Sequence, residues 1–427
     1  RLDRMPDWKR YTYKLKNFKI DRDILDKALE IKEDDDKTLY LYLKWVYEDE
    51  RQIENVFTML AERPDISLKM AITKEKFKKK LRNPESRLNE TASEQYEAIL
   101  DKQADICMQI FSKPICVLAG AAGTGKTTVI KAIVENIERV HGQAAGFLLM
   151  APTGKAAERI KTQTEKNSMT IHSYLAGNGW LNRNFTLKRV GGSKGQDVNT
   201  IIIDECSMID IMLMYNLLKA LPQQMSLILV GDIDQLPSVG AGNVLRDIID
   251  SGCVPVVRLT RIFRQAQGSR IIMNAHRINR GEGIDMRGGK DADFFFATKE
   301  SNQEVVDTIV QYCKTNLPRY YHVDPLQDIQ VLTPMQRGEC GAVNLNQVLQ
   351  EAMNPSKIFL RRGGTQYRLK DKVMQIRNDY DKEVFNGDIG TITKVDVEER
   401  ELTVLFDERE VIYDVTELDE LALAYAV

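Results

Sequence analysis

A glycine-rich segment, GAAGTGKTT, which begins at Gly120, constrains this chain more than any other part of its sequence. It directly follows an apolar run, ICVLA, and it opens a stretch with helical periodicity, TTVIKAIVENI. Glycines let such a loop curl so that successive backbone N–H groups point at a phosphate, with the positive end of the helix dipole behind them. This order of strand, loop and helix is the context in which the pattern binds nucleotides, and it disfavours an accidental glycine-rich turn.

The side chains of the loop predict how it holds a nucleotide. Lys126 can neutralise the β- and γ-phosphate oxygens, and the Thr127 hydroxyl can ligate Mg²⁺. ATP and Mg²⁺ are therefore the expected cofactors. The expected cofactor-binding residues of the loop are Gly120, Gly123, Gly125, Lys126, Thr127 and Thr128.

A second run, IIIDECSMID, brings Asp204 and Glu205 to the end of a strand of β-branched residues. Adjacent acids are common on protein surfaces, but ionised carboxylates beside a buried strand need a compensating partner, and a metal ion supplies one. We therefore expect Asp204 to hold Mg²⁺ and Glu205 to orient and deprotonate the attacking water.

A third run, SLILVGD, leads to Gln235 in the segment GDIDQ. A polar amide at a strand end beside the first two motifs can hydrogen-bond the γ-phosphate and report its presence to the rest of the protein. An aspartate-rich turn explains the same residues equally well. The pattern alone leaves both interpretations open.

The pattern around these motifs indicates a parallel sheet with helices on both faces, because short apolar runs alternate with helical stretches from about residue 91. Residues 1–90 are dense in charge and predict amphipathic helices, for example over TLYLYLKWVYEDERQIENVFTML. The basic run KEKFKKKLR in that region can grip phosphates, but a solvated helix face is the commoner origin of such a run, and we assign it no site. Beyond about residue 358, short alternating strands between Gly and Asp turns indicate a small barrel.

Composition excludes several classes of protein. Of the 427 residues, 43% are hydrophobic and 29% are charged, which excludes wholesale disorder. The six cysteines form no CxxC pair and have no histidine at zinc-ligand spacing. No apolar run is long enough to cross a bilayer and the start lacks a signal peptide, so we expect a cytoplasmic protein with no membrane partner. The net charge of −2 does not indicate a nucleic-acid partner, although a local groove can still be basic.

Together these segments resemble superfamily 1 helicases, and in particular the RecD-like branch, the exodeoxyribonuclease V alpha-subunit family. The resemblance spans about residues 88–427. LNETASEQYEAI resembles the family's Q motif, which implies that Gln95 reads the adenine edge. APTGKAAERI and TIHSYL resemble motifs Ia and Ib, which touch single-stranded DNA in that family, although His172 alone also fits a satisfied polar residue at a helix start. The implied DNA-binding residues are Pro152, Thr153, Lys155, Thr170 and His172.

The resemblance also assigns residues that follow the third strand. LTRIFRQAQGSRIIMNAHRIN resembles motif IV, which implies that Arg264 reaches the γ-phosphate as an arginine finger, a role that suits a planar guanidinium. Arg261 is the alternative finger, and a salt-bridged helix arginine is the structural alternative. The stretch GNGWLNRNFTLKRVGGSKGQDV holds the position of the family's strand-separating hairpin, with Gly191 and Gly192 as its turn. The expected catalytic residues are Lys126, Glu205, Gln235 and Arg264.

The residue patterns together with this resemblance imply an α/β fold with two RecA-like P-loop NTPase lobes, a helical N-terminal region and a small SH3-like β-barrel insertion. The expected domains are a helical region over residues 1–90, a first RecA-like lobe over 91–254 with a hairpin insertion near 177–198, an incomplete second RecA-like lobe over 255–357, the barrel over 358–420, and a strand over 421–427 that returns to the second lobe.

The function that the resemblance implies is an ATP-dependent DNA helicase that moves 5'-to-3' on single-stranded DNA or tailed duplex DNA, with protein subunits of a repair complex as further partners. Two alternatives stay open: a non-translocating ATPase switch subunit of a DNA repair or defence complex, and a motor that acts on RNA. The chain ends at LALAYAV, before the family's motifs V and VI. We therefore expect a fragment that binds ATP but hydrolyses it feebly and couples hydrolysis poorly to DNA.

Overall fold

The computed structural model describes most of the chain, in separate stretches. The described residues are 27–33, 39–66, 73–82, 93–121, 123–141, 146–181, 198–222, 225–259, 269–286, 292–377, 379, 382, 384, 386–406 and 409–427. The chain divides into two compact units, one made of residues 1–152 and 159–267 and the other of residues 153–158 and 268–427.

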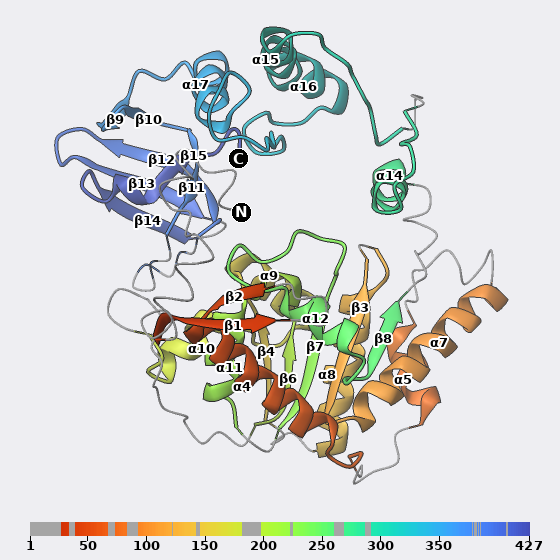
Figure 1. Ribbon diagram of the computed structural model, residues 1–427. Coiled ribbons are helices and arrows are strands. Elements are labelled where there is room, and N and C mark those ends of the chain that lie inside the picture. Colours follow the sequence, from red (N-terminus) through yellow and green to blue (C-terminus); the bar gives the residue numbers. More distant parts are fainter. Residues whose placement is uncertain are drawn as a thin grey trace. The chain divides into compact units, whose positions relative to one another are not determined.

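A parallel sheet forms the centre of the first unit (Figure 1). Its six strands lie in the order β5-β4-β6-β7-β3-β8, and each strand runs parallel to its neighbours. The apolar runs PICVLAG, GFLLMAP, NTIIIDE and SLILVGD all supply strands of this sheet, which confirms the predicted α/β core. The strands are β3 (Ile115–Gly120), β4 (Gly146–Ala151), β5 (Met169–Thr170), β6 (Val198–Ile203), β7 (Ser226–Gly231) and β8 (Val256–Leu259).

Helices cover the two faces of this sheet. Successive residues of each strand point to opposite sides, so the apolar side chains on both faces need a covering layer. Ile115 and Val117 belong to one core cluster with residues of α4, α10, α11 and α12. Cys116 and Leu118 are fully buried on the other side, and α8 packs on β3. The helices are α4 (Lys44–Ala61), α8 (Lys126–His141), α9 (Gly154–Thr164), α10 (Ile171–Gly177), α11 (Ile211–Ala220) and α12 (Val244–Ser251).

The N-terminal region is less helical than its charge pattern predicted. The stretch that begins TLYLYLKW starts as strand β2 (Leu39–Leu43), which pairs antiparallel with β1 (Leu29–Glu33). LYLYL alternates with a period of two and is rich in aromatic residues, and both properties favour a strand over a helix. Helix α4 begins only at Lys44, and it buries Phe57 in the core of the first unit. Residues 1–26 lie outside the described residues.

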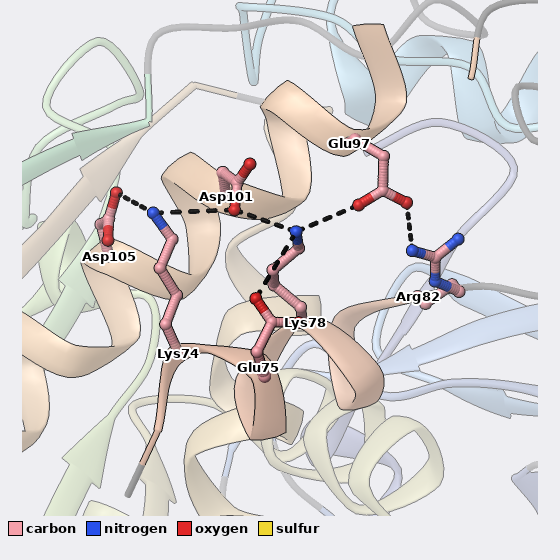
Figure 2. A network of polar contacts seen from close by, with 7 residues as sticks. All are labelled: Lys74, Glu75, Lys78, Arg82, Glu97, Asp101 and Asp105. Atoms are coloured by element: carbon pink, nitrogen blue, oxygen red, sulfur yellow. Dashed lines mark hydrogen bonds and ion pairs between the residues drawn. The ribbon is translucent and has the colours of Figure 1, made fainter. Parts of the chain in front are cut away.

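The basic run KEKFKKKLR forms helix α5 (Lys74–Leu81), which packs along α7 (Ser93–Ser112). Figure 2 shows its cations facing a row of acids on α7. Lys78 Nζ lies 3.1 Å from a Glu97 oxygen and 3.0 Å from an Asp101 oxygen. Other ion pairs of the run join Lys74 to Asp105 at 2.7 Å, Arg82 to Glu97, and Lys80 to Glu135 of α8 at 2.7 Å. Four cations of the run, Lys74, Lys78, Lys80 and Arg82, therefore bind acids of the same chain, so the run is more than a solvated face.

This network makes the stability of the first unit depend on pH. The hydrogen bonds from Lys78 hold the pKa of Glu97 and of Asp101 below their usual values of 4.5 and 3.8. A carboxyl with a lowered folded-state pKa stabilises the fold above its unfolded-state pKa, and the contribution is lost as the pH falls through the folded-state value. We expect Lys78→Ala to lower the thermal midpoint of unfolding at neutral pH. The difference in midpoint from the parent should shrink as the pH falls below 4.5, the usual pKa of Glu97, and then below 3.8, the usual pKa of Asp101.

Thermal unfolding of the two proteins across this pH range measures the effect. The matched control is Lys79→Ala, because Lys79 is an exposed residue of the same helix. High salt should also reduce the difference, since exposed ion pairs are screened. A loss that is equally large at neutral and acidic pH would mean that Lys78 stabilises the fold by packing alone.

Strand β8 belongs to the first unit, although we placed the start of the second lobe at residue 255. Its residues Val256–Leu259 pair in parallel with β3, at the edge of the sheet. The short run VVRL shows that a strand forms but carries no information about its partner, which only the packed sheet decides.

The second unit combines helices with a small sheet. Of the helices that the structure describes in the two units, none has both the length and the apolar character needed to span a bilayer. The helices of the second unit are α14 (Arg270–Asn279), α15 (Asn302–Gln311), α16 (Leu317–Tyr321) and α17 (Ala342–Met353), with a π-helical turn, η3 (Tyr312–Asn316), joining α15 to α16.

An antiparallel sheet of five strands, in the order β14-β13-β12-β11-β15, forms the rest of the second unit, next to the hairpin of β9 and β10. This is the expected small β-barrel insertion. Beyond β15 the chain pairs in parallel with residue 331, where Val427 N donates to Val331 O at 3.1 Å. The strands are β9 (Phe359–Arg362), β10 (Thr365–Arg368), β11 (Lys372–Gln375), β12 (Ile389–Asp396), β13 (Glu401–Phe406), β14 (Arg409–Asp414) and β15 (Leu421–Leu423).

A fully buried carboxylate, Asp371, ties the parts of the second unit together. It accepts side-chain hydrogen bonds from Gln350 at 2.5 Å and Asn354 at 2.6 Å, at the end of α17. The Tyr425 hydroxyl donates to it at 2.7 Å, and the backbone N–H of Arg368 donates at 2.6 Å. Burial raises the pKa of Asp371, while these hydrogen bonds act in the opposite direction. One side chain therefore links α17, β10 and the chain after β15.

Candidate nucleotide-binding site

The glycine-rich loop connects β3 to α8, as the sequence predicted. Lys126 is the first residue of α8, and its ammonium group folds back onto the loop. Its Nζ donates to the carbonyl oxygens of Gly120 at 2.5 Å and Ala121 at 3.2 Å. Thr127 and Thr128 follow in the first turn of the helix, where Thr127 is half-buried and Thr128 is exposed. The positive charge therefore sits at the mouth of the loop, held by groups that a phosphate can replace.

The glycines of the loop are needed for two different reasons. Gly123 and Gly125 have φ angles of 75° and 87°, a region that other residues rarely adopt. At Gly120 the reason is space, because a Cβ there would lie 2.6 Å from Thr124 Oγ1 and 3.0 Å from Leu259 Cβ. The loop curls tightly between the ends of β3 and β8, and only glycine permits this.

The acidic pair lies at the carboxyl end of β6, the neighbour of β4 and β7. Asp204 is buried, its backbone N–H donates to Met150 O at 2.9 Å, and its Oδ1 accepts from the Glu205 N–H at 2.9 Å. Glu205 adopts the left-handed conformation, with φ 52° and ψ 39°. Strained conformations of this kind in residues other than glycine cluster at functional sites, where the surrounding packing holds them.

Electrostatics at the pair favour a bound cation. Burial raises the pKa of Asp204 and of Glu205, and the charges of Lys126 and Arg159 act against both shifts. The nearby charges of Asp204 and Asp232 raise the pKa of Glu205 further. Glu205 Oε2 is buried and has no hydrogen-bond partner among the described residues. Such poorly compensated carboxylates are a suitable environment for a divalent cation.

Mg²⁺ fits these residues. Among the residues that the structure describes, no group of three or more His, Cys, Asp or Glu side chains is arranged to hold a metal. Mg²⁺ does not require one, because one or two carboxylates suffice when phosphates and water complete its shell. Asp204 and the Thr127 hydroxyl are the residues that would hold it.

Gln235 lies beyond the end of β7, in a turn centred on a buried aspartate. Its Nε2 donates to Asp232 Oδ2 at 3.2 Å, and the Asp234 N–H donates to Asp232 Oδ1 at 3.1 Å. Asp232 itself is buried, whereas Gln235 is exposed. The aspartate-rich turn is therefore present in this conformation, and the phosphate-sensing role of Gln235 stays a prediction.

The residues expected to contact DNA follow the carboxyl ends of β4 and β5, where Ala151 pairs with Thr170. Thr170 is the N-cap of α10, and its Oγ1 accepts from Ser173 N at 3.0 Å. His172 follows on that helix; burial lowers its pKa, and the charge of Asp210 opposes the shift. Thr170 thus already has a structural role as a helix cap.

The segment after β4 begins α9. Pro152 is half-buried, and Thr153 Oγ1 accepts from Ala156 N at 3.3 Å, which caps the helix. Lys155 is exposed in the first turn of α9. An exposed lysine at a helix start is free to meet a phosphate backbone, so its DNA contact stays a prediction.

Several predicted positions lie outside the described residues. Arg261 and Arg264 fall within 260–268, and most of the predicted hairpin, with Gly191 and Gly192, falls within 182–197. Gln95 lies on helix α7, but its side chain is not among those described.

Two residues of this region were not expected from the sequence. Arg159 acts electrostatically on both acids, and Ser207 lies two residues after Glu205 with its hydroxyl buried. The sequence offered one signal for Arg159: it follows Lys155 by four residues, and residues four apart share a face of a helix. Nothing in the sequence singled out the serine.

Comparison with known protein families identifies two regions of the chain. Residues 98–294 match the model described as an AAA domain. Residues 345–406 match the ATP-dependent RecD-like DNA helicase SH3 domain, and this range includes most of α17 and three of the five strands of the antiparallel sheet.

Comparison with individual proteins points to the same group. The ATP-dependent RecD2 DNA helicase of Deinococcus radiodurans is 34% identical over 331 residues, which cover 78% of this chain and 43% of that protein. The RecBCD enzyme subunit RecD of Haemophilus influenzae is 23% identical, covering 65% of this chain and 55% of that protein. The chain thus matches about half of the length of these relatives.

Among solved structures, a crystal structure of Pif1 helicase from Bacteroides in complex with ADP-AlF3 and single-stranded DNA aligns with 76% of this chain and 81% of that chain. The identity is 17% and the TM-score is 0.44.

Three findings agree on the kind of protein. They are the order of elements around the phosphate loop, the antiparallel sheet that follows it, and the match to RecD2 over most of the chain. This chain joins an AAA domain to a RecD-like DNA helicase SH3 domain, and it is similar to the RecD2 helicase over most of its length.

Proposed function

We propose that this chain is the motor core of an ATP-dependent DNA helicase, which couples ATP hydrolysis to 5'-to-3' movement along single-stranded DNA. The observation that carries the proposal is that the Lys126 loop after β3 and the poorly compensated acidic pair after β6 belong to one sheet, in which only β7 lies between the two strands. A phosphate-binding cation beside a general base is what hydrolysis of a triphosphate requires. The relative named ATP-dependent RecD2 DNA helicase supports the choice of DNA as the track.

Each residue of the site has a proposed task. Lys126 exchanges the loop carbonyls of Gly120 and Ala121 for phosphate oxygens. Thr127 and Asp204 would hold Mg²⁺, which would neutralise phosphate charge. Glu205 orients the attacking water and takes its proton, and its raised pKa suits it to that task.

The remaining assignments concern communication and partners. Gln235 senses the γ-phosphate, Arg264 reaches it as a finger, and Gln95 reads the adenine edge. Single-stranded or tailed duplex DNA contacts Pro152, Thr153, Lys155, Thr170 and His172. The RecD relatives are named as subunits of the RecBCD enzyme, so we include partner proteins of a repair complex in the proposal.

Two measurements on the protein that contains these 427 residues test the proposal. ATP hydrolysis is compared without nucleic acid, with DNA oligonucleotides and with RNA oligonucleotides, and we expect DNA to stimulate it most. Unwinding is then compared on duplexes with 5' or 3' tails, and we expect activity on the 5'-tailed duplex. Stimulated hydrolysis without strand separation or movement would identify a switch, and stronger stimulation by RNA would identify an RNA motor.

Replacement of Lys155 by alanine tests the DNA contact. A lysine that neutralises one phosphate releases about one counterion, so its loss should weaken binding of all sequences alike and reduce the salt slope by about one. Fluorescence titration of labelled oligonucleotides at several salt concentrations measures both quantities. Lys161→Ala is the matched control, because Lys161 is exposed near the other end of α9. Equal slopes for Lys155→Ala and the parent would remove Lys155 from the proposed DNA path.

A further inference from the structure

Ser207 is a buried serine without an evident structural role. It is 7% exposed, and its Oγ has no hydrogen-bond partner among the described residues. It lies in the 3-10 turn η2 (Cys206–Met208), two residues after the proposed general base Glu205. A buried hydroxyl without a partner costs free energy that an alanine at the same place would not, so a serine here suggests a second state in which the hydroxyl is bonded.

The surroundings of Ser207 indicate what that partner is. The serine lines a cavity of about 110 Å³ together with Ile233, Gln235, Pro237, Asn243, Leu245 and Arg246. The Arg246 guanidinium is already engaged, because its Nη2 donates to Ile233 O at 2.8 Å. The Gln235 amide shares the cavity, and its Nε2 is the group that donates to Asp232. Gln235 Oε1 is therefore an acceptor that the serine can serve.

The packing around η2 gives Ser207 a fixed place. A Cβ at Gly231 would lie 3.3 Å from Ser207 N and 2.5 Å from Leu245 Cδ2, so the turn rests directly against the end of β7. On its other side, Glu205 leads into the turn in the left-handed conformation. The backbone of Ser207 is thus fixed relative to both the acidic strand and the start of the Gln235 turn.

We propose that Ser207 is a positioning residue for Gln235, an inference that rests on the proposed function. When the Gln235 Nε2 group leaves Asp232 and turns to the γ-phosphate, the Ser207 hydroxyl donates to Gln235 Oε1, directly or through one water. An amide presents either NH₂ or oxygen, and only the NH₂ end attracts a phosphate. A donor placed on the oxygen side selects the productive orientation. The serine therefore links the acidic strand to the residue that distinguishes triphosphate from diphosphate.

The test is the preference of the 427-residue chain for triphosphate over diphosphate, measured with fluorescent ATPγS and ADP analogues. We expect Ser207→Ala to reduce this preference by about three- to tenfold, the factor that one hydrogen bond supplies. Its thermal midpoint should be unchanged or higher, because an unpaired buried hydroxyl has been removed. In a Gln235→Ala background, Ser207→Ala should have no further effect on the preference.

Two further variants separate a hydrogen bond from packing. Ser207→Thr keeps the hydroxyl and should keep the preference, and a loss as large as that of alanine would overturn the proposal. Ser251→Ala is the matched control, since the Ser251 hydroxyl at the end of α12 donates to Ile248 O at 2.7 Å. It should lower the thermal midpoint and leave the preference unchanged.

The outcome also distinguishes this inference from the function on which it rests. If Ser207→Ala lowers the thermal midpoint and leaves the preference unchanged, the serine is structural and the inference is wrong. The proposed function stands in that case, provided that Lys126→Ala abolishes triphosphate binding or turnover. If Lys126→Ala binds and hydrolyses ATP normally, the proposed function itself fails.

Discussion

Lys126→Ala is expected to lower ATP turnover by at least two to three orders of magnitude, roughly the loss found when one preorganised charge or donor is removed from a transition state. No other residue of GAAGTGKTT is positively charged, so nothing in the loop replaces the ammonium group. The fold should survive, because the lost contacts are two hydrogen bonds to loop carbonyls. Steady-state ATP hydrolysis with saturating single-stranded DNA measures the effect.

Two variants define the controls for this result. Lys131 lies on the same helix and forms only a long ion pair on the surface, with Glu165 at 3.8 Å. The variant Lys131→Ala should therefore keep the parent activity. Glu205→Gln should bind ATP without turning it over, because Asp204 remains as a metal ligand while the water loses its base. Near-parent turnover by Lys126→Ala would place phosphate binding elsewhere, and near-parent turnover by Glu205→Gln would assign the base to another residue.

Asp371→Asn is expected to destabilise the second unit by about 3 kcal/mol or more, a typical cost of breaking a buried, charged hydrogen-bond network. The two carboxylate oxygens accept from four donors, supplied by Gln350, Asn354, Arg368 and Tyr425. Asparagine has only one acceptor oxygen, and its NH₂ group would face donors. At least part of the network would then be buried without partners.

Hydrogen exchange of the α17 amides measures this loss in the second unit directly, because a chain of two units need not unfold in one step. Asp419→Asn is the matched control, since Asp419 pairs on the surface with Arg362 at 2.9 Å and its side chain is 56% exposed. It should change protection little. Equal protection in Asp371→Asn and the parent would show that the network contributes orientation without stability.

The strands of the first sheet and the loop geometry were predictable from sequence because their causes are local. Ile201 to Ile203 form a buried strand through their own side chains, and Gly123 and Gly125 adopt positive φ because they lack a Cβ. The predicted fold class is confirmed for the same reason. The roles of Lys126 and Glu205 rest on the chemistry of these residue types, and they remain predictions.

Other features depended on partners that the local pattern does not name. Apolar positions three and four residues apart predict a helix over the stretch that contains LYLYL, yet LYLYL pairs with β1 as a strand. VVRL was assigned to the second lobe, but it completes the first sheet beside β3. In both cases the local pattern showed that the segment is regular and apolar, and it did not show which strand the segment pairs with.

By itself, the sequence determined the phosphate loop, the acidic strand and the α/β class, since each follows from neighbouring residues and their chemistry. Only the tertiary structure decided that the cations of α5 bind acids of α7, that Arg159 acts on Asp204, and that Ser207 shares a cavity with Gln235. These relations join positions that lie tens of residues apart in the sequence. They exist because close packing brings side chains of different elements within bonding distance, and a linear pattern records burial but not neighbours.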